Sequence, residues 1–138
     1  MKRIAAVLFV VAAIAAASAS SAVKSPATAR SSSLSCSGAI SWQTAGGAIG
    51  RVATIRGRVA GTRFASASNG SPTFLNLGVN YPNPRRFTVV IWIENRAAFG
   101  RPEVRYRGKT LCVRGRVKTY GGVPEIEARS PSQITVVR

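Results

Sequence analysis

Two segments far apart in the chain share one pattern, and this pattern restricts the fold more than any other feature. The segments "GRVATIRGRV" (residues 50–59) and "GKTLCVRGRV" (108–117) both begin with a glycine and a basic residue and end in Arg-Gly-Arg-Val. Their β-branched and aliphatic residues predict strands. The glycine inside each strand, Gly57 or Gly115, is typical of a strand that bends or passes close to another part of the chain. Two such strands favour a small sheet that curls strongly.

The residues between the two repeated segments predict further strands around a polar connection. Residues 73–77 alternate two leucines with Phe74 and Asn76, and residues 87–93 form a β-branched and aromatic run. Both patterns are typical of strands. The connection "NYPNPRR" (80–86) carries prolines and asparagines, the residues that favour turns.

The rest of the chain continues as short elements. Residues 94–100 predict one or two helical turns, which end at Gly100 and Pro102. The second repeated strand runs to about Tyr120, and a tight turn at 121–124 leads to the last strand pieces, "EIEA" and "ITVV". This order predicts an all-β domain: a small five-stranded Greek-key barrel (OB-fold) with a short helix between strands 3 and 4. An open meander and an SH3-like barrel remain alternatives.

Several motifs resemble a family of bacterial OB-fold domains. The similar segments are "GSPTFLNLG" (70–78), "FTVVIW" (87–92), "YRGK" (106–109) and "YGGVPEI…SPSQI" (120–134). Members of this family occur alone behind export signals or attached to secreted nucleases and other envelope proteins. The resemblance covers residues 40–137 and implies an exported OB-fold domain. It implies less about activity, because one fold hosts many functions.

The first residues have the form of an export signal. Two basic residues precede the apolar run 4–17, which small residues follow up to a cleavage site at Ala19. We expect residues 1–19 to be the signal peptide, with cleavage after Ala22 as the second choice. A membrane anchor is the less favoured alternative, because a spanning helix needs about 20 apolar residues. The mature protein would then lie in the periplasm or outside the cell, without a transmembrane segment.

The next residues predict a leader and a disulfide-bonded domain. Residues 20–35 are rich in Ser, Ala and Thr and predict a flexible leader. The folded domain is expected over residues 36–138. Cys36 and Cys112, in an exported chain, predict one disulfide between the start of the domain and a late strand. The chain has no C-x-x-C motif and no His, so we expect no metal site and no cofactor.

The charge of the chain is strongly positive. Twenty Lys and Arg face four Glu, with a formal net charge of +16, and removal of the signal peptide would take away two of the positive charges. A field of this size attracts polyanions and speeds their association. Charge alone does not distinguish DNA, RNA, acidic glycans, lipopolysaccharide and anionic lipid. A merely solubilising surface is the other interpretation.

Catalysis is disfavoured by the inventory of side chains. The chain has neither His nor Asp, so neither a Ser-His-Asp nor a Cys-His arrangement is possible. A metal-dependent nuclease needs clustered carboxylates for its cation. Glu125 and Glu127 share one face of a predicted strand, where balancing nearby arginines is the favoured interpretation. We therefore expect a protein that is not an enzyme.

A binding surface is the remaining interpretation. OB folds bind ligands on the face of strands 2 and 3, framed by two loops, which correspond here to residues 63–72 and 121–124. Single-strand binders combine a basic groove with aromatic side chains on which bases stack. The candidate residues are those of the first loop, the polar connection and the outward strand positions: Arg56, Arg58, Arg63, Phe74, Asn76, Tyr81, Arg85, Arg86, Trp92, Arg114, Arg116, Lys118 and Tyr120.

Some candidates carry more weight than others. Tyr81 is the best candidate for an exposed aromatic side chain, and Arg85 and Arg86 beside it could bind phosphates through their planar guanidinium groups. Phe74 and Trp92 are more often core residues than stacking platforms.

The sequence therefore predicts a non-catalytic exported module that binds an anionic polymer, with single-stranded nucleic acid as the first choice. The alternative is a structural or protein-interaction module of the bacterial envelope, whose charge holds it near anionic surfaces. A metal-dependent nuclease is third.

Overall fold

The computed structural model describes residues 36–138, which form a mostly β fold with short helices. The sheet has eight strands, in the order β6-β7-β4-β3-β2-β5-β8, with β1 added beside β2. The predicted all-β class is thus confirmed at this level. The predicted signal peptide (1–19) and leader (20–35) lie outside the described residues and stay predictions. None of the helices in the described part of the chain is long and apolar enough to cross a membrane.

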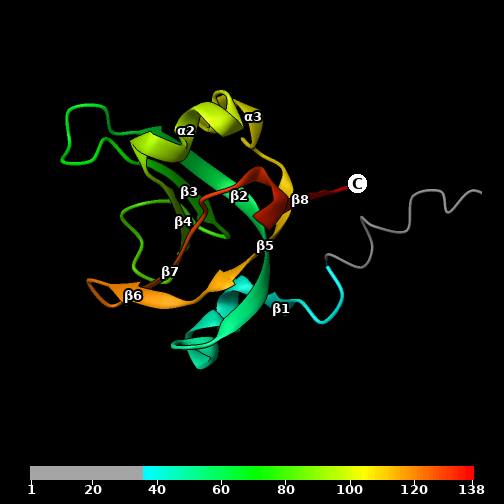
Figure 1. Cartoon of the computed structure of the whole chain (residues 1–138). Coiled ribbons are helices and arrows are strands. Elements are labelled where there is room, and N and C mark those ends of the chain that lie inside the picture. The colour runs from blue at the N-terminus through cyan, green and yellow to red at the C-terminus, as the bar shows by residue number, and fades with distance from the viewer. Residues whose placement is uncertain (1–35) are drawn as a thin grey trace, which may run out of the picture.

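Figure 1 shows how the elements follow one another along the chain. The strands are β1 (Ile40–Ser41), β2 (Val52–Phe64), β3 (Thr73–Leu77), β4 (Phe87–Ile91), β5 (Thr110–Arg116), β6 (Lys118–Tyr120), β7 (Val123–Glu127) and β8 (Ile134–Val137). The helices are η1 (Trp42–Ala48), α2 (Ile93–Phe99), α3 (Pro102–Arg105) and η2 (Pro131–Gln133).

The two repeated segments lie side by side as antiparallel neighbours. Residues Val52–Arg58 of β2 pair with residues Thr110–Arg116 of β5, and Ile55 lies opposite Val113. Ile55 and Val113 are both the sixth residue of their repeated segment. Because the two strands are antiparallel, the segments are related by an approximate local two-fold axis through this pair. Both side chains are fully buried. The repeat therefore encodes one strand pair that contributes its inward face to the core.

The glycines of the repeat allow neighbouring side chains to approach the strands. A Cβ atom on Gly115 would lie 2.6 Å from Cγ2 of Ile126, which is fully buried. A Cβ atom on Gly57 would lie 3.0 Å from Cβ of Leu77 and 3.0 Å from Cδ1 of Trp42. The predicted close approach is thus present at both positions, because the strongly curled sheet brings other side chains onto these strands.

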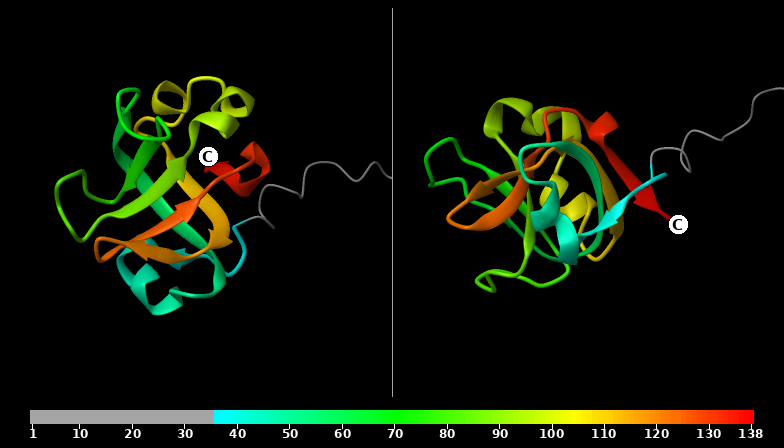
Figure 2. Two further views of the ribbon diagram at one scale, coloured as in Figure 1. Left: turned by 60° about the vertical axis from the view of Figure 1, so that its left-hand side comes forward. Right: turned by 90° about the horizontal axis from the view of Figure 1, so that it is seen from below.

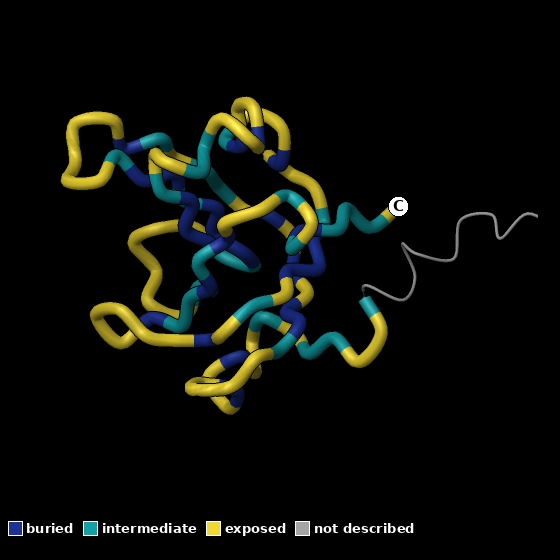
Figure 3. Tube along the Cα trace, in the orientation of Figure 1, coloured by how far each residue is buried: buried dark blue, intermediate teal, exposed yellow. Residues whose placement is uncertain are grey.

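The core lies between the inward faces of the strands. Its largest fully buried side chains come from most of the strands and from the helical region: Tyr106, Phe87, Phe99, Ile55, Leu75, Leu77, Ile91, Leu111 and Ile126. Leu75 and Leu77 face inward, as the alternation in residues 73–77 predicted. Burial of these apolar side chains is the main force that stabilises the curled sheet. Figure 3 shows the buried segments inside and the exposed loops around them.

Two details differ from the sequence prediction. The second repeated strand does not run without a break to Tyr120, because Val117 separates β5 from β6. The amide N–H of Val117 donates to the carbonyl of Arg51 at 2.9 Å, and its side chain is fully buried.

The segment predicted as one or two helical turns forms two separate helices. The cap residue of α2 is Gly100, which has a φ of 75°, and Pro102 begins α3. A proline is well suited to a first helical position, so Pro102 starts a second helix as well as following the first.

The disulfide Cys36–Cys112 is present, as predicted, with its Cα atoms 5.5 Å apart. Cys112 is buried on β5, opposite Thr135 of β8 and Arg56 of β2. The bridge therefore ties the first described residues to the β2–β5–β8 part of the sheet. The right-hand view of Figure 2 shows β1 and β8 on one side of the molecule, with the loops that follow β2 and β3 and the β6–β7 hairpin on the other.

Candidate ligand-binding groove

Three connections far apart in sequence project from the same side of the molecule. They are the β2–β3 loop (65–72), the β3–β4 loop (78–86) and the β6–β7 turn at Gly121 and Gly122 (Figure 1). Between them lies a groove of about 370 Å³. The residues that line it come from five strands and two of these loops: Arg63, Ala65, Ser68, Phe74, Asn76, Asn80, Tyr81, Arg86, Thr88, Tyr120, Val123 and Glu125.

Strand register explains why these side chains share one face. Asn76 of β3 pairs with Thr88 of β4, and Thr88 pairs with Glu125 of β7, so the three form a polar row across the sheet. Arg63 pairs with Phe74 in the neighbouring row. Residues directly opposite one another on adjacent strands point to the same face. The groove is therefore the outer face of β2, β3, β4 and β7.

A β-bulge in β2 brings Arg63 to this face. The register with β3 shifts between Val59 and Gly61. Before the shift the odd-numbered Ile55 and Val59 are buried in the core, whereas after it Arg63 is exposed and lies opposite Phe74. An extra residue in one strand reverses the alternation of its side chains. Without the bulge, Arg63 would point inward.

Hydrogen bonds hold the floor of the groove in place. Nδ2 of Asn76 donates to Oδ1 of Asn80 at 2.9 Å, and Oγ1 of Thr88 donates to Oδ1 of Asn76 at 3.3 Å. Asn80 rests directly on Gly61, where a Cβ atom would overlap its side chain. The glycine thus lets the β3–β4 loop fold down onto the sheet. Asn76 and Thr88 are buried beneath it, with 4% and 5% exposed.

The walls of the groove carry aromatic and basic side chains. Tyr81 and Tyr120 are 65% and 79% exposed, which is unusual for tyrosines of a folded domain. The guanidinium carbon of Arg86 lies 5.0 Å from the ring centroid of Tyr81, and Nη1 of Arg86 donates to the carbonyl of Asn83 at 2.9 Å. Arg86 therefore holds the Tyr81 ring at the rim by a cation–π contact.

The charged side chains of the groove come from three places: Arg63 from β2, Arg86 from the residue before β4, and Glu125 from β7. Arg63 lies on β2 and Glu125 lies on β7, with β3 and β4 between them. Burial raises the pKa of Glu125 above its usual range, Lys118 opposes this effect, and the charge of Glu127 adds to it. Among the described residues Glu125 makes no ion pair.

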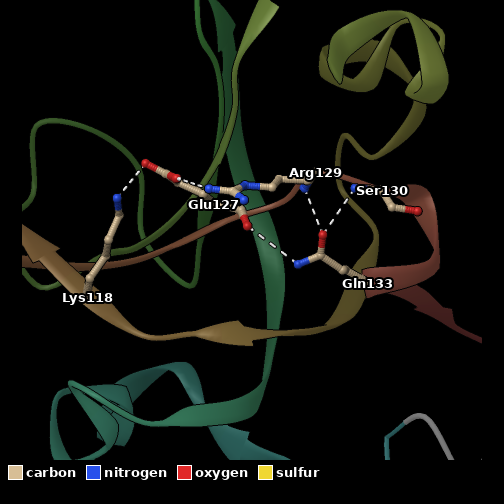
Figure 4. Close-up of polar contacts among 5 residues, drawn as sticks. All are labelled: Lys118, Glu127, Arg129, Ser130 and Gln133. Atoms are coloured by element: carbon tan, nitrogen blue, oxygen red, sulfur yellow. Dashed lines mark hydrogen bonds and ion pairs between the residues drawn. The ribbon is translucent and has the colours of Figure 1, made fainter. Parts of the chain in front are cut away.

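Glu127, two residues along β7, has a different role (Figure 4). Nζ of Lys118 donates to Oε1 of Glu127 at 2.5 Å, and Arg129 lies within 4.0 Å of the other oxygen. The hydrogen bond from Lys118 lowers the pKa of Glu127, burial raises it, and a hydrogen bond from Trp92 and the charges of Lys118 and Arg129 lower it further. Glu127 thus balances basic side chains, as the sequence indicated.

Gln133 fastens the end of β7 beside this ion pair. Its Oε1 accepts from the amide N–H of Arg129 at 2.7 Å and from that of Ser130 at 3.1 Å (Figure 4). Its Nε2 donates to the carbonyl of Arg114 at 3.0 Å. The side chain therefore joins the chain after β7 to β5.

Six of the thirteen predicted binding residues line the groove: Arg63, Phe74, Asn76, Tyr81, Arg86 and Tyr120. Phe74 lies on the groove face and is partly exposed, not part of the core. Arg85 is exposed in the β3–β4 loop, with its amide N–H donating to Oδ1 of Asn83. Lys118 lies next to the groove but is paired with Glu127.

Four predicted arginines lie elsewhere. Arg56 and Arg58 line a second, separate hollow that shares no residue with the groove. Arg114 and Arg116 lie opposite Thr54 and Val52 on the same strand pair. All four face outward, as their alternation with buried residues predicted, but the curl of the sheet turns this outward surface away from the groove.

Trp92 lies beneath the β2–β3 loop and does not line the groove. A Cβ atom on Gly70 would lie 2.9 Å from Cε3 of the indole ring, and the amide N–H of Ile93 donates to the carbonyl of Gly70 at 3.2 Å. The indole therefore supports the base of the loop, and the loop covers it.

Sequence reasoning did not name Ala65, Ser68, Asn80, Thr88, Val123 or Glu125 individually, although it placed binding loops at 63–72 and 121–124, which include Ala65, Ser68 and Val123. Asn80 and Ser68 reach the groove through loop conformations that the sequence pattern does not encode. Thr88 and Glu125 are aligned with Asn76 by register, and Glu125 was interpreted only as balancing nearby arginines. In residues 36–138 no three His, Cys, Asp or Glu side chains lie close enough together to hold a metal ion.

No protein-family model and no curated protein matches the sequence. Solved structures are similar in shape. In the Stn1–Ten1 complex of S. pombe the identity is 19%, the match covers 63% of this chain and 58% of that one, and the TM-score is 0.46. OBody AM1L10 bound to hen egg-white lysozyme is 17% identical, over 67% of this chain and 84% of that one, with a TM-score of 0.46. Entamoeba histolytica asparaginyl-tRNA synthetase with asparaginyl-adenylate is 17% identical, and the match covers 72% of this chain with a TM-score of 0.45. This chain spans 23% of that synthetase.

Proposed function

We propose that residues 36–138 form a binding module for single-stranded nucleic acid, with the groove as its binding site. One observation carries the proposal: the groove combines exposed tyrosines, Tyr81 and Tyr120, with two arginines, Arg63 and Arg86, on one sheet face. Stacking on aromatic rings and neutralisation of phosphates are the two interactions on which single-strand binders depend. A base stacked on Tyr81 or Tyr120 would leave its phosphate beside an arginine.

The proposal includes an OB-fold barrel of five strands. Only Val117 separates β5 from β6, and β5 pairs with β2 while β6 pairs with β7. If β5 and β6 are counted as one bent strand, this strand pairs with β2 at one end of the order β7-β4-β3-β2 and with β7 at the other, which closes the sheet into a barrel. The helices α2 and α3 then fall between the third and fourth strands, as in OB folds, and the groove lies on the face that OB folds use for ligands.

The proposed module is non-catalytic and exported, to the periplasm or the extracellular space. A chain without His or Asp has few groups for acid–base or metal chemistry. The export signal proposed for residues 1–19 and the disulfide Cys36–Cys112 support an oxidising compartment. We also propose that the chain belongs with the bacterial exported OB-fold domains that its motifs resemble.

Titration of a fluorescently labelled single-stranded oligonucleotide, followed by anisotropy, tests the proposed binding. The logarithm of affinity should fall linearly with the logarithm of salt concentration, because arginines that contact phosphates release counterions. In the Arg85→Ala/Arg86→Ala variant the slope should shrink by about 1.4, since each single-strand phosphate contact accounts for about 0.7. The label is placed on the oligonucleotide because Trp92 lies outside the groove.

A matched control separates local contact from overall charge. The Arg56→Ala/Arg114→Ala variant removes the same two charges from the outward face of β2 and β5, away from the groove. It should bind with nearly the wild-type salt slope. Equal loss in both double variants would assign the binding to net charge and not to the groove, and absence of oligonucleotide binding at low salt would refute the proposal.

A structural or protein-interaction module of the envelope is the second candidate. One observation favours it: Arg56, Arg58, Arg114 and Arg116 form an outward surface distinct from the groove. Such a surface would bind duplex DNA, heparin and anionic vesicles with affinities similar to that for single strands. Comparable binding to all four, unaffected by Tyr81→Ala, would favour this second function.

A further inference from the structure

We propose that Glu125 selects cytosine, which carries an amino group at C4, over uracil and thymine, which carry a carbonyl there. This inference rests on the proposed function, because it names the base that the same groove prefers. An ionised carboxylate only accepts hydrogen bonds. It therefore favours the 4-amino donor of cytosine and disfavours the 4-carbonyl that uracil and thymine carry at the same ring position.

The position of Glu125 in the sheet supports this role. Along β7 the fully buried Ile126 points into the core, so Glu125 points to the opposite, outer face. Register places Glu125 beside Thr88, which in turn lies beside Asn76, so Glu125 belongs to the polar row on the floor of the groove. A base stacked on the exposed tyrosines would have its edge toward this row.

The carboxylate is free to accept a hydrogen bond. Lys118 lies directly opposite Glu125 in the β6–β7 register, but its Nζ donates to Glu127. The ion pairs of residues 36–138 involve the glutamates Glu103 and Glu127 and do not include Glu125. A half-buried, unpaired carboxylate on the groove floor costs desolvation energy, which a ligand donor would offset.

The charges of the groove also orient a strand within it. Glu125 repels phosphate from its own position, while Arg63 on β2 and Arg86, directly before β4, attract phosphate to theirs. Phosphates of a single strand would therefore lie beside Arg63 and Arg86, which leaves the position of Glu125 to a base edge. A carboxylate in a site for a polyanion is explained by this arrangement, whereas a site built only to hold phosphates would have no use for it.

The test compares two oligonucleotides that differ only in the base. Oligo(dC) and oligo(dU) of equal length are titrated with the mature protein at moderate salt and at about pH 8, well above the usual carboxyl pKa range. The wild-type protein should prefer oligo(dC) by roughly tenfold, the lower part of the range for one well-placed base contact. Because both ligands carry the same phosphates, the ratio of affinities cancels the general electrostatic attraction.

The variant Glu125→Gln should reduce this ratio to about one. An amide both accepts and donates hydrogen bonds, so it can pair with either base. Glu94→Gln is the matched control, since it removes the same charge from an exposed position on α2 and should leave the ratio unchanged. Glu125→Ala provides a second variant without any polar side-chain group, and its melting temperature shows that the domain is folded.

Each outcome decides a different claim. A wild-type ratio near one, or a ratio that Glu125→Gln leaves intact while both oligonucleotides still bind, would overturn the selection by Glu125 and leave the proposed function standing. Failure of every oligonucleotide to bind the wild-type protein would instead refute the proposed function.

Discussion

At the scale of single residues, glycines at three strand positions explain how a chain with a modest core can form so curved a sheet. Gly115 admits Ile126 to the core, Gly57 admits Leu77 and Trp42, and Gly61 admits Asn80 to the outer face. At Gly61 and Gly115 a Cβ atom would overlap a neighbouring side chain, and at Gly57 it would make a very tight contact. Protein interiors are packed densely, so such positions tolerate little added volume.

Gly115→Ala should therefore destabilise the domain by about 1–3 kcal/mol, the usual cost of overpacking. The new methyl group would lie 2.6 Å from Cγ2 of the fully buried Ile126, a contact that requires this side chain or its strand to shift. Urea unfolding followed by circular dichroism measures the free energy. Gly47→Ala is the control, because a Cβ atom there meets nothing within 4 Å. Equal stability of the two variants would contradict the close-packing explanation.

At the scale of elements, the β6–β7 hairpin carries both the groove carboxylate and its neighbouring ion pair. Glu125 and Glu127 lie on one strand and face the same side, yet burial raises the pKa of the first and Lys118 lowers that of the second. The difference arises because Lys118 reaches diagonally to Glu127. One hairpin thus supplies both a paired carboxylate and an unpaired one.

The ion pair predicts a pH dependence of stability with a defined sign. Because the folded-state pKa of Glu127 is lowered, the pair stabilises the protein above the unfolded value near 4.5, and this stabilisation is lost as the pH falls through the folded-state pKa. Lys118→Ala should raise the pKa of Glu127, measured by NMR titration. It should cost at most about 0.5 kcal/mol near neutral pH, since Lys118 is largely exposed, and nothing at low pH.

Lys109→Ala is the control for this measurement, because Lys109 is exposed and makes no ion pair among the described residues. It should leave the pKa of Glu127 nearly unchanged. A pKa of Glu127 that stays equally low without Lys118 would mean that Trp92 or Arg129 is the dominant cause.

At the scale of the whole molecule, the disulfide and the groove share no residue: Cys112 lies on β5, whereas the groove residues come from β2, β3, β4, β6, β7 and two loops. The disulfide joins β5 to the start of the domain and closes a sequence separation of 76 residues. Stability and binding should therefore be separable.

Replacement of both cysteines, in Cys36→Ala/Cys112→Ala, should lower the free energy of unfolding by about 4 kcal/mol, because the unfolded chain regains the freedom of a long loop. Affinity for a single-stranded oligonucleotide should stay within a factor of about two, a free-energy change of less than half a kcal/mol. Urea unfolding and anisotropy titration measure the two quantities. A large loss of affinity under conditions in which the variant remains folded would contradict this separation.

Much of the fold was predictable from local pattern. The alternation in residues 73–77 correctly placed Leu75 and Leu77 in the core, and the two cysteines correctly predicted the disulfide. Such features depend on side-chain period and residue type, which are local properties of the chain. The break at Val117 and the second helix at Pro102 were missed, because tertiary hydrogen bonds and packing decide them.

The sequence by itself determined which residues share a face within each regular stretch of strand, because a strand alternates every second residue. It also determined that the outward surface is rich in arginine. Only the tertiary structure decided which outward residues share a side. The curl of the sheet separated Arg56 and Arg114 from Tyr81, and the bulge after Val59 turned Arg63 toward Phe74. Register then placed Glu125 in the groove, since alignment between strands depends on contacts far apart in sequence.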